Sequence, residues 1–170
     1  MKLILVMAIT ADGKIGVDKN HLANWTSKED KQHFSNLTKE AGVLIFGRNT
    51  FSTINRSLPG RKIIVLTNTP EKYQNIPGEV EYKKATTGKD ILDELASQGY
   101  QKVILGGGAA INEFFLEKNI VDEIYITIEP LLFGRGLGIA ENTQLKTRLK
   151  LLNIDRINQD SVVLHYEVLR

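Results

Sequence analysis

Short apolar runs of strand length recur along the chain and alternate with segments of helical character. The run Leu3–Thr10 is continuous, as expected for a strand that is covered on both faces. Further strands are predicted at 43–46, 63–67, 80–82, 103–105 and 123–129, and helices at 26–39, 50–54, 89–98 and 109–118. This alternation is typical of an α/β protein whose strands are mostly parallel.

The C-terminal part of the chain has a different pattern. Arg148–Ile157 and Ser161–Leu169 alternate or run apolar, and they flank Asn158-Gln159-Asp160, a sequence typical of a turn. We therefore expect an antiparallel hairpin added to a mostly parallel sheet. A length of 170 residues suits one domain over residues 1–170, and the sequence contains no repeat or low-complexity linker.

The charged and metal-binding residue types exclude several functions. The net charge is +2 and the longest basic run is Lys83-Lys84, so a basic stripe for nucleic acid is absent. The chain has no cysteine, and His21, His33 and His165 lack metal-ligand spacing, so we expect no metal. The apolar N-terminal run is too short to span a membrane and has no cleavage site after it, so we expect a cytoplasmic protein.

Asp30 is unusual because helical spacing places it on an apolar face. Asp30, Phe34, Leu37 and Ala41 recur at four, seven and eleven residues and therefore share one side of the predicted helix. An inward carboxylate is costly unless a partner uses it, so Asp30 would bind a cationic or amidine-like group or deliver a proton. The alternative is a structural role, in which Asp30 caps the helix or pairs with a buried arginine.

Two overlapping frames could cap the start of this helix. Thr26 with Glu29 fits a capping box, and Ser27 with Asp30 is the second frame. Because Glu29 lies on the polar face, we predict that Thr26 and Glu29 form the cap. Trp25 precedes the helix and either packs into the core or forms a wall of a substrate cleft.

Two glycine turns favour a phosphate ligand. Gly47-Arg48-Asn49-Thr50 and Gly106-Gly107-Gly108 each lie between a predicted strand and a predicted helix. Glycine lets a ligand approach the backbone N–H groups, and Arg48 could add a charge-assisted contact to a phosphate. Two such junctions suggest a dinucleotide lying across the strand ends. The chain lacks both the P-loop and the Rossmann fingerprint, because Lys14-Ile15-Gly16 follows the first strand instead.

Together these residues give the chain a resemblance to dihydrofolate reductase, over most of the first 130 residues and the final hairpin. The segments that carry the resemblance are Asp12–Gly16, Trp25 with Asp30 and Phe34, Gly47–Phe51 with Ile54, Leu58–Lys62, Leu105–Gly108 and Thr127. The resemblance implies a three-layer fold with a mostly parallel sheet of about eight strands. It also implies NADPH-dependent reduction of 7,8-dihydrofolate to 5,6,7,8-tetrahydrofolate by a monomer or homodimer.

The resemblance further implies three groups of site residues. The catalytic group is Asp30, Thr127 and Trp25. The substrate-binding group is Val6, Ala8, Phe34, Ile54, Leu58, Arg61 and Leu105, in which Arg61 would pair with the glutamate tail of folate. The cofactor-binding group is Ala8, Ile15, Gly16, Gly47, Arg48, Asn49, Thr50, Leu66, Thr67, Asn68, Gly106, Gly107, Gly108, Ala109 and Ala110.

Other segments resemble a related family. Val121–Gly136, with Asp12–Ile15 and Trp25–Ser27, is similar to the reductase domain of the riboflavin-pathway deaminase-reductase. The chain also departs from the dihydrofolate reductase pattern, because Ile111 replaces a tyrosine and Ala109 replaces an arginine. Three functions therefore stay open: a dihydrofolate reductase, a riboflavin-type or other pterin reductase, and a nucleotide- or flavin-binding module without catalysis.

Overall fold

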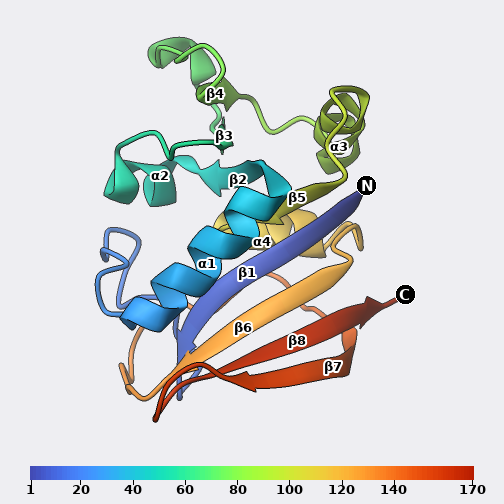
Figure 1. Cartoon of the computed structure of the whole chain (residues 1–170). Helices are drawn as coiled ribbons and strands as arrows, with labels where there is room; N and C mark the ends of the chain where they lie inside the picture. The colour runs from blue at the N-terminus through green and yellow to red at the C-terminus, as the bar shows by residue number, and fades with distance from the viewer.

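The computed structural model describes residues 1–170 and shows one eight-stranded sheet between two layers of helices (Figure 1). The elements are β1 Lys2–Thr10, α1 Lys28–Ala41, β2 Val43–Gly47, α2 Arg48–Ile54, β3 Lys62–Leu66, a 3-10 turn Pro70–Lys72, β4 Val80–Lys83, α3 Gly88–Ser97, β5 Lys102–Leu105, α4 Ala109–Leu116, β6 Glu123–Glu129, β7 Arg148–Arg156 and β8 Val162–Leu169. The strand order is β4-β3-β2-β5-β1-β6-β8-β7.

In this order the first six strands, from β4 at the edge to β6, are parallel to one another. Strand β8 runs antiparallel to both of its neighbours, β6 and β7. The predicted α/β fold, with about eight strands and an antiparallel C-terminal hairpin, is therefore confirmed. The bounds of the predicted strands and helices differ from the observed ones by at most two residues.

The apolar strands are buried because helices cover both faces of the sheet (Figure 1). Leu3 and Leu5 pack with Phe115 of α4 in one core cluster. Ile4 and Val6 belong to the other cluster, on the side of α1 and α2. Alternate residues of β1 thus face opposite layers, which explains why this parallel strand is apolar without interruption.

The start of α1 differs from the predicted cap. Ser27 is the N-cap, and its hydroxyl oxygen accepts a hydrogen bond from the N–H of Asp30 at 3.1 Å. The predicted box of Thr26 and Glu29 is wrong. The reason is tertiary: the N–H of Ser27 donates to the Glu129 carboxylate at 2.7 Å, which fixes Ser27 at the helix boundary.

The C-terminal hairpin forms one edge of the sheet. All nine residues of β7 are exposed, whereas β8 buries Val163 and Val168. The turn is held by Asn158, whose side-chain oxygen accepts the N–H groups of Asp160 and Ser161 at 2.9 and 2.7 Å. No helix in the structure has the length and apolar character that crossing a lipid bilayer requires.

Candidate active site

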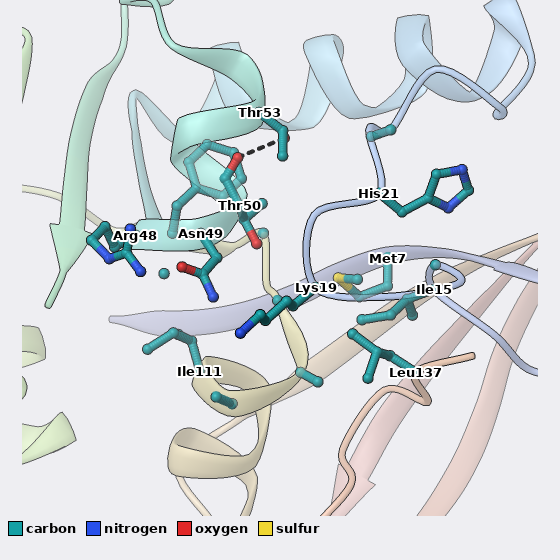
Figure 2. A pocket seen from close by; sticks show the side chains of 18 of the residues that line it. Met7, Ile15, Lys19, His21, Arg48, Asn49, Thr50, Thr53, Ile111 and Leu137 are labelled. Carbon is teal, nitrogen blue, oxygen red and sulfur yellow. Dashed lines mark hydrogen bonds between the residues drawn. The ribbon is translucent and has the colours of Figure 1, made fainter. Parts of the chain in front are cut away.

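A cleft of about 870 Å³ opens at the carboxyl ends of the parallel strands. Its lining comes from the ends of β1, β2, β3 and β5 and from the turns that follow them (Figure 2). Ligands of open α/β sheets bind at this edge, outside the carboxyl ends of the strands. The volume is at the upper end of the range for small-molecule sites, so two ligands side by side can fit.

Part of the cleft is formed by two turns that meet through their backbones. The N–H of Gly47, after β2, donates to the carbonyl oxygen of Gly107, after β5, at 2.8 Å. A Cβ on Gly47 would lie 2.6 Å from a side-chain carbon of Ile111, and a Cβ on Gly108 would lie 2.9 Å from the hydroxyl of Thr50. Both positions therefore require glycine, and both turns present bare backbone to the cleft.

Asp30 lines one end of the cleft. It is 9% exposed, and its carboxylate makes no hydrogen bond or ion pair with the protein. Phe34 and Phe46 also line the cleft and stack with their ring centroids 6.3 Å apart. The ammonium of the neighbouring Lys31 donates a hydrogen bond to the carbonyl oxygen of Thr26 at 2.8 Å and makes no ion pair with Asp30. A buried carboxylate without a partner is unfavourable, so this end of the cleft favours a ligand with cationic or amidine-like N–H groups.

Glu129 is a second buried acid, which the sequence analysis missed. It is 2% exposed, and its two oxygens accept hydrogen bonds from the N–H of Ser27 at 2.7 Å and from the hydroxyl of Ser161 at 2.6 Å. Burial acts to raise the pKa of this carboxyl, but the hydrogen bonds from Ser161 and Ser27 outweigh burial and lower it. Glu129 thereby joins the C-terminal hairpin to the cap of the helix that carries Asp30. The period-two spacing of Thr127 and Glu129 could have identified it as inward-facing.

Away from Asp30, the cleft carries free positive charge. Arg48 and Lys19 both line it, both are exposed, and neither makes a hydrogen bond or ion pair within the protein. Asn49 lies next to Arg48 in the first turn of α2 (Figure 2). Two carboxylates, Asp18 and Glu141, also line the cleft. The unpaired cations suit a phosphate ligand, because charge-assisted hydrogen bonds to phosphate are stronger than neutral ones.

Lys19 belongs to loop 17–24, whose hydrogen bonds all lie within the loop. The N–H of Val17 donates to the His21 ring at 3.1 Å, and the N–H of Asn20 donates to the Asp18 carboxylate at 2.7 Å. The N–H of His21 donates to the carbonyl oxygen of Asp18 at 3.2 Å. No hydrogen bond holds this loop to the rest of the protein, so it can move without breaking one.

The segment just before this loop is held firmly. The Asp12 carboxylate accepts the N–H groups of Phe133 and Gly134 at 3.2 and 2.7 Å. The hydrogen bond from Thr10 lowers the pKa of Asp12 the most, and burial opposes it only in part. The N–H of Ile15 donates to the carbonyl oxygen of Leu137 at 2.8 Å. Segments 10–16 and 131–137 therefore pack as one unit.

Comparison with known proteins places the chain in a family. The profile of the RibD C-terminal domain matches residues 1–163. The chain belongs to the RibD C-terminal domain family. It is also 30% identical to dihydrofolate reductase type 9 of Escherichia coli, over 88% of this chain and 76% of that protein. The RibD C-terminal and dihydrofolate reductase relationships together make this chain a member of an oxidoreductase family.

Two solved structures share the fold. A pyrimidine reductase-like protein from Corynebacterium diphtheriae superimposes with a TM-score of 0.80 at 16% identity, over 99% of this chain and 92% of that one. The dihydrofolate reductase from Enterococcus faecalis, complexed with NADP(H) and RAB-propyl, superimposes with a TM-score of 0.70 at 24% identity, over 98% and 96% of the two chains. This RibD C-terminal domain therefore has the dihydrofolate reductase-like fold that the sequence predicts.

Most of the predicted site residues of this RibD C-terminal domain lie together in the cleft. Those that line it are Val6, Ala8, Ile15, Gly16, Trp25, Asp30, Phe34, Gly47, Arg48, Asn49, Thr50, Ile54, Leu66, Thr67, Asn68, Gly106, Gly108, Ala109 and Ala110. Trp25 forms part of the wall of the cleft, and it packs edge-on against Phe133 with the ring centroids 5.1 Å apart.

Five predicted residues do not line the cleft, namely Leu58, Arg61, Leu105, Gly107 and Thr127. The guanidinium of Arg61 instead donates to the Thr38 hydroxyl at 3.0 Å and to the Pro59 carbonyl oxygen at 3.3 Å. Leu105 is fully buried in a core cluster. Thr127 is 2% exposed, and no direct hydrogen bond joins its hydroxyl to Asp30.

Other residues that line the cleft were missed. They are Met7, Asp18, Lys19, His21, Ala23, Thr26, Lys31, Phe46, Thr53, Thr69, Ala85, Ile111, Leu137, Glu141 and Asn142. Met7, Phe46 and Thr69 adjoin predicted residues in the sequence, so the neighbouring residues gave a signal for them. Residues 137–142 gave none, because no periodicity or motif marks that irregular segment.

Proposed function

We propose that this protein reduces 7,8-dihydrofolate to 5,6,7,8-tetrahydrofolate with NADPH. The observation that carries the proposal is the buried Asp30 carboxylate, which has no protein partner and lines the cleft with Phe34 and Trp25. Its two oxygens can accept the 2-amino group and the N3 hydrogen of a pterin in a two-pronged contact. Phe34 offers an aromatic face on which the pterin ring can lie.

The cleft residues fit a dinucleotide cofactor. The two glycine turns leave room for a ligand to approach the backbone, and the free guanidinium of Arg48 can meet the 2′-phosphate. When bound there, the cofactor would supply the hydride for C6 of the pterin. Asp30 would hold the pterin edge and help to bring a proton to N5. Thr127, which makes no direct hydrogen bond to Asp30, would orient that carboxylate through a water molecule.

Reduction of a ribosylaminopyrimidine phosphate of the riboflavin pathway is the second candidate function. The family match over residues 1–163 favours it. The position of Arg61 also favours it, because the guanidinium that would pair with the folate tail lies outside the cleft lining and donates to Thr38 and Pro59. Asp30 would bind such a substrate differently: the uracil on which a related riboflavin-pathway reductase acts has a carbonyl group at position 2 where a pterin has an amino group, so only a ring N–H could donate to the carboxylate.

The test is an assay of NADPH absorbance with each substrate in turn. We expect oxidation of NADPH with dihydrofolate, blocked by an antifolate, and abolished in Asp30→Asn. The matched control is Glu29→Gln, since Glu29 is the adjacent, exposed acid of α1 and does not line the cleft. Turnover restricted to the ribosylaminopyrimidine phosphate would replace the first function with the second. Cofactor binding without turnover of either substrate would leave a nucleotide-binding module.

A further inference from the structure

Lys19 is a free cation for which the proposed reaction gives no role. Figure 2 shows its side chain extending from loop 17–24 into the space between Asn49 of α2 and Ile111 of α4. Arg48 lies beyond Asn49 on the same wall of the cleft. Because the Lys19 ammonium has no partner in the protein, its charge is available to a ligand in the middle of the cleft.

The middle of the cleft is where the phosphates of a dinucleotide would lie. If the reacting ring lies beside Asp30 and the 2′-phosphate meets Arg48, as the proposed function requires, the pyrophosphate would lie between them. The first turn of α4, Ala109–Ile111, carries no charged side chain, and α2 contributes only Arg48. Lys19 is therefore the cation best placed to balance the pyrophosphate charge.

We infer that Lys19 binds the pyrophosphate of the cofactor. This inference rests on the dinucleotide cofactor of the proposed function. The loop that carries Lys19 makes no hydrogen bond to the rest of the protein, and the His21 ring packs against Phe133 with the ring centroids 5.3 Å apart, so Lys19 can adjust to the ligand without breaking a hydrogen bond. The neighbouring Asp18 carboxylate also lines the cleft, and its negative charge weakens the attraction for an anion. It accepts a hydrogen bond from the N–H of Asn20 within the loop and makes no ion pair with Lys19.

The inference separates the roles of the two cations. Both NADPH and NADH contain the pyrophosphate, whereas only NADPH carries the 2′-phosphate. Loss of Lys19 should therefore weaken both cofactors by the same factor. Loss of Arg48 should weaken NADPH alone.

The test is a fluorescence titration of each cofactor against the full chain, which needs no turnover. We expect Lys19→Ala to raise the Kd of both NADPH and NADH about tenfold, with a smaller effect at high salt. Lys19→Arg should restore most of the affinity. Lys72→Ala is the charge-matched control, because Lys72 is exposed, makes no ion pair and does not line the cleft.

Three results would overturn the inference. These are an unchanged Kd in Lys19→Ala, a change confined to NADPH, and an equal change in Lys72→Ala. Failure of the wild-type protein to bind either cofactor is a different result, because it would remove the proposed function itself. Wild-type binding with an unaffected Lys19→Ala variant would remove only the role of Lys19.

Discussion

At the Asp30 end of the cleft the acid is buried, and a helix cap holds its backbone in place, whereas at the Arg48 end the cations are exposed and make no hydrogen bond to the protein. Asp30 follows a cap that is fixed by Glu129 and, through it, by Ser161 of the hairpin. Arg48 and Lys19 have no internal partner at all. The first end is organised by the protein before a ligand arrives, and the second is organised by the ligand.

This difference follows from what each end has to recognise. A flat heterocycle that reacts at one atom needs an acceptor in a fixed place, because small displacements of a reacting group cost rate. A phosphate has several equivalent oxygens, so flexible cations can find it from more than one direction. Substitutions at the Asp30 end should therefore change kcat or stability, and those at the Arg48 end should change Kd.

The largest effect is expected for Asp30→Asn. The amide can neither accept both N–H groups of the substrate nor relay a proton to N5, so kcat should fall by about a thousandfold. The variant should be at least as stable as the wild type to urea, because a buried charge without a partner is lost. Steady-state kinetics with urea unfolding checks both statements. A small change in kcat would show that the fixed acid is not the reacting group.

Glu129→Gln should affect the same end by disturbing the position of the helix. The amide can no longer accept both hydrogen bonds, so the free energy of unfolding should fall by about 2 kcal/mol. The kcat should also fall, whereas the Kd of NADPH should stay unchanged. Urea unfolding and cofactor titration give the two readouts. Glu167→Gln is the control, because Glu167 makes an exposed ion pair with Lys150 on the outer hairpin and its loss should cost less than about 0.5 kcal/mol.

Glu129 also makes a prediction about pH. Its pKa lies below the ordinary value of 4.5 in the folded protein, so the unfolded chain binds a proton more readily as the pH falls. The stabilisation from Glu129 is therefore complete above that value and is lost as the pH falls through the lowered pKa. Urea midpoints measured from about pH 6 to about pH 3 should fall more steeply for the wild type than for Glu129→Gln. Parallel curves would contradict this.

Arg48→Ala sharpens the comparison at the other end. The Kd of NADPH should rise about tenfold because a charge-assisted contact to phosphate is lost. Raising the salt concentration should reduce the difference in Kd between the variant and the wild type. The Kd of NADH, the stability and the kcat at saturating cofactor should stay near the wild-type values. A fall in stability would show that Arg48 belongs to the fold and not to the ligand site.

The smallest effect concerns the cap of α1. Ser27→Ala should cost about 1 kcal/mol because the N–H of Asp30 loses its acceptor. Thr26→Ala should change the stability by less than about 0.5 kcal/mol, since Thr26 does not cap the helix. Thermal unfolding of the two variants under one condition decides between the frames. Equal losses would mean that the tertiary contact to Glu129, and not the hydroxyl of Ser27, holds the helix end.

The fold was largely predictable because its strands are covered on both faces. Leu3–Ile9 is apolar at every position, and its first four residues are buried, so its pattern indicates a parallel strand without any tertiary knowledge. The cap of α1 was not predictable. Thr26 and Ser27 offer equivalent local chemistry, and the choice is made by Glu129, about a hundred residues away in sequence, through the N–H of Ser27.

The site was predictable where strand ends define it. Gly47–Thr50 and Gly106–Gly108 adjoin the carboxyl ends of parallel strands, which must meet at one edge of the sheet. Lys19 and Glu141 lie in irregular segments whose positions depend on tertiary contacts, so no local pattern marks them. Arg61 was assigned to the folate tail, but the structure shows that Thr38 engages its guanidinium outside the cleft lining.

The hydrogen bond between the turns after β2 and β5 couples these two turns, which form one wall of the cleft. With no side chain between Gly47 and its neighbours, and with its N–H bonded to Gly107, neither turn can shift without carrying the other. Any change of shape as a ligand enters must then come from the opposite wall, in loop 17–24. Amide hydrogen exchange should show this asymmetry directly, with slow exchange at Gly47 and rapid exchange at Leu22 and its neighbours.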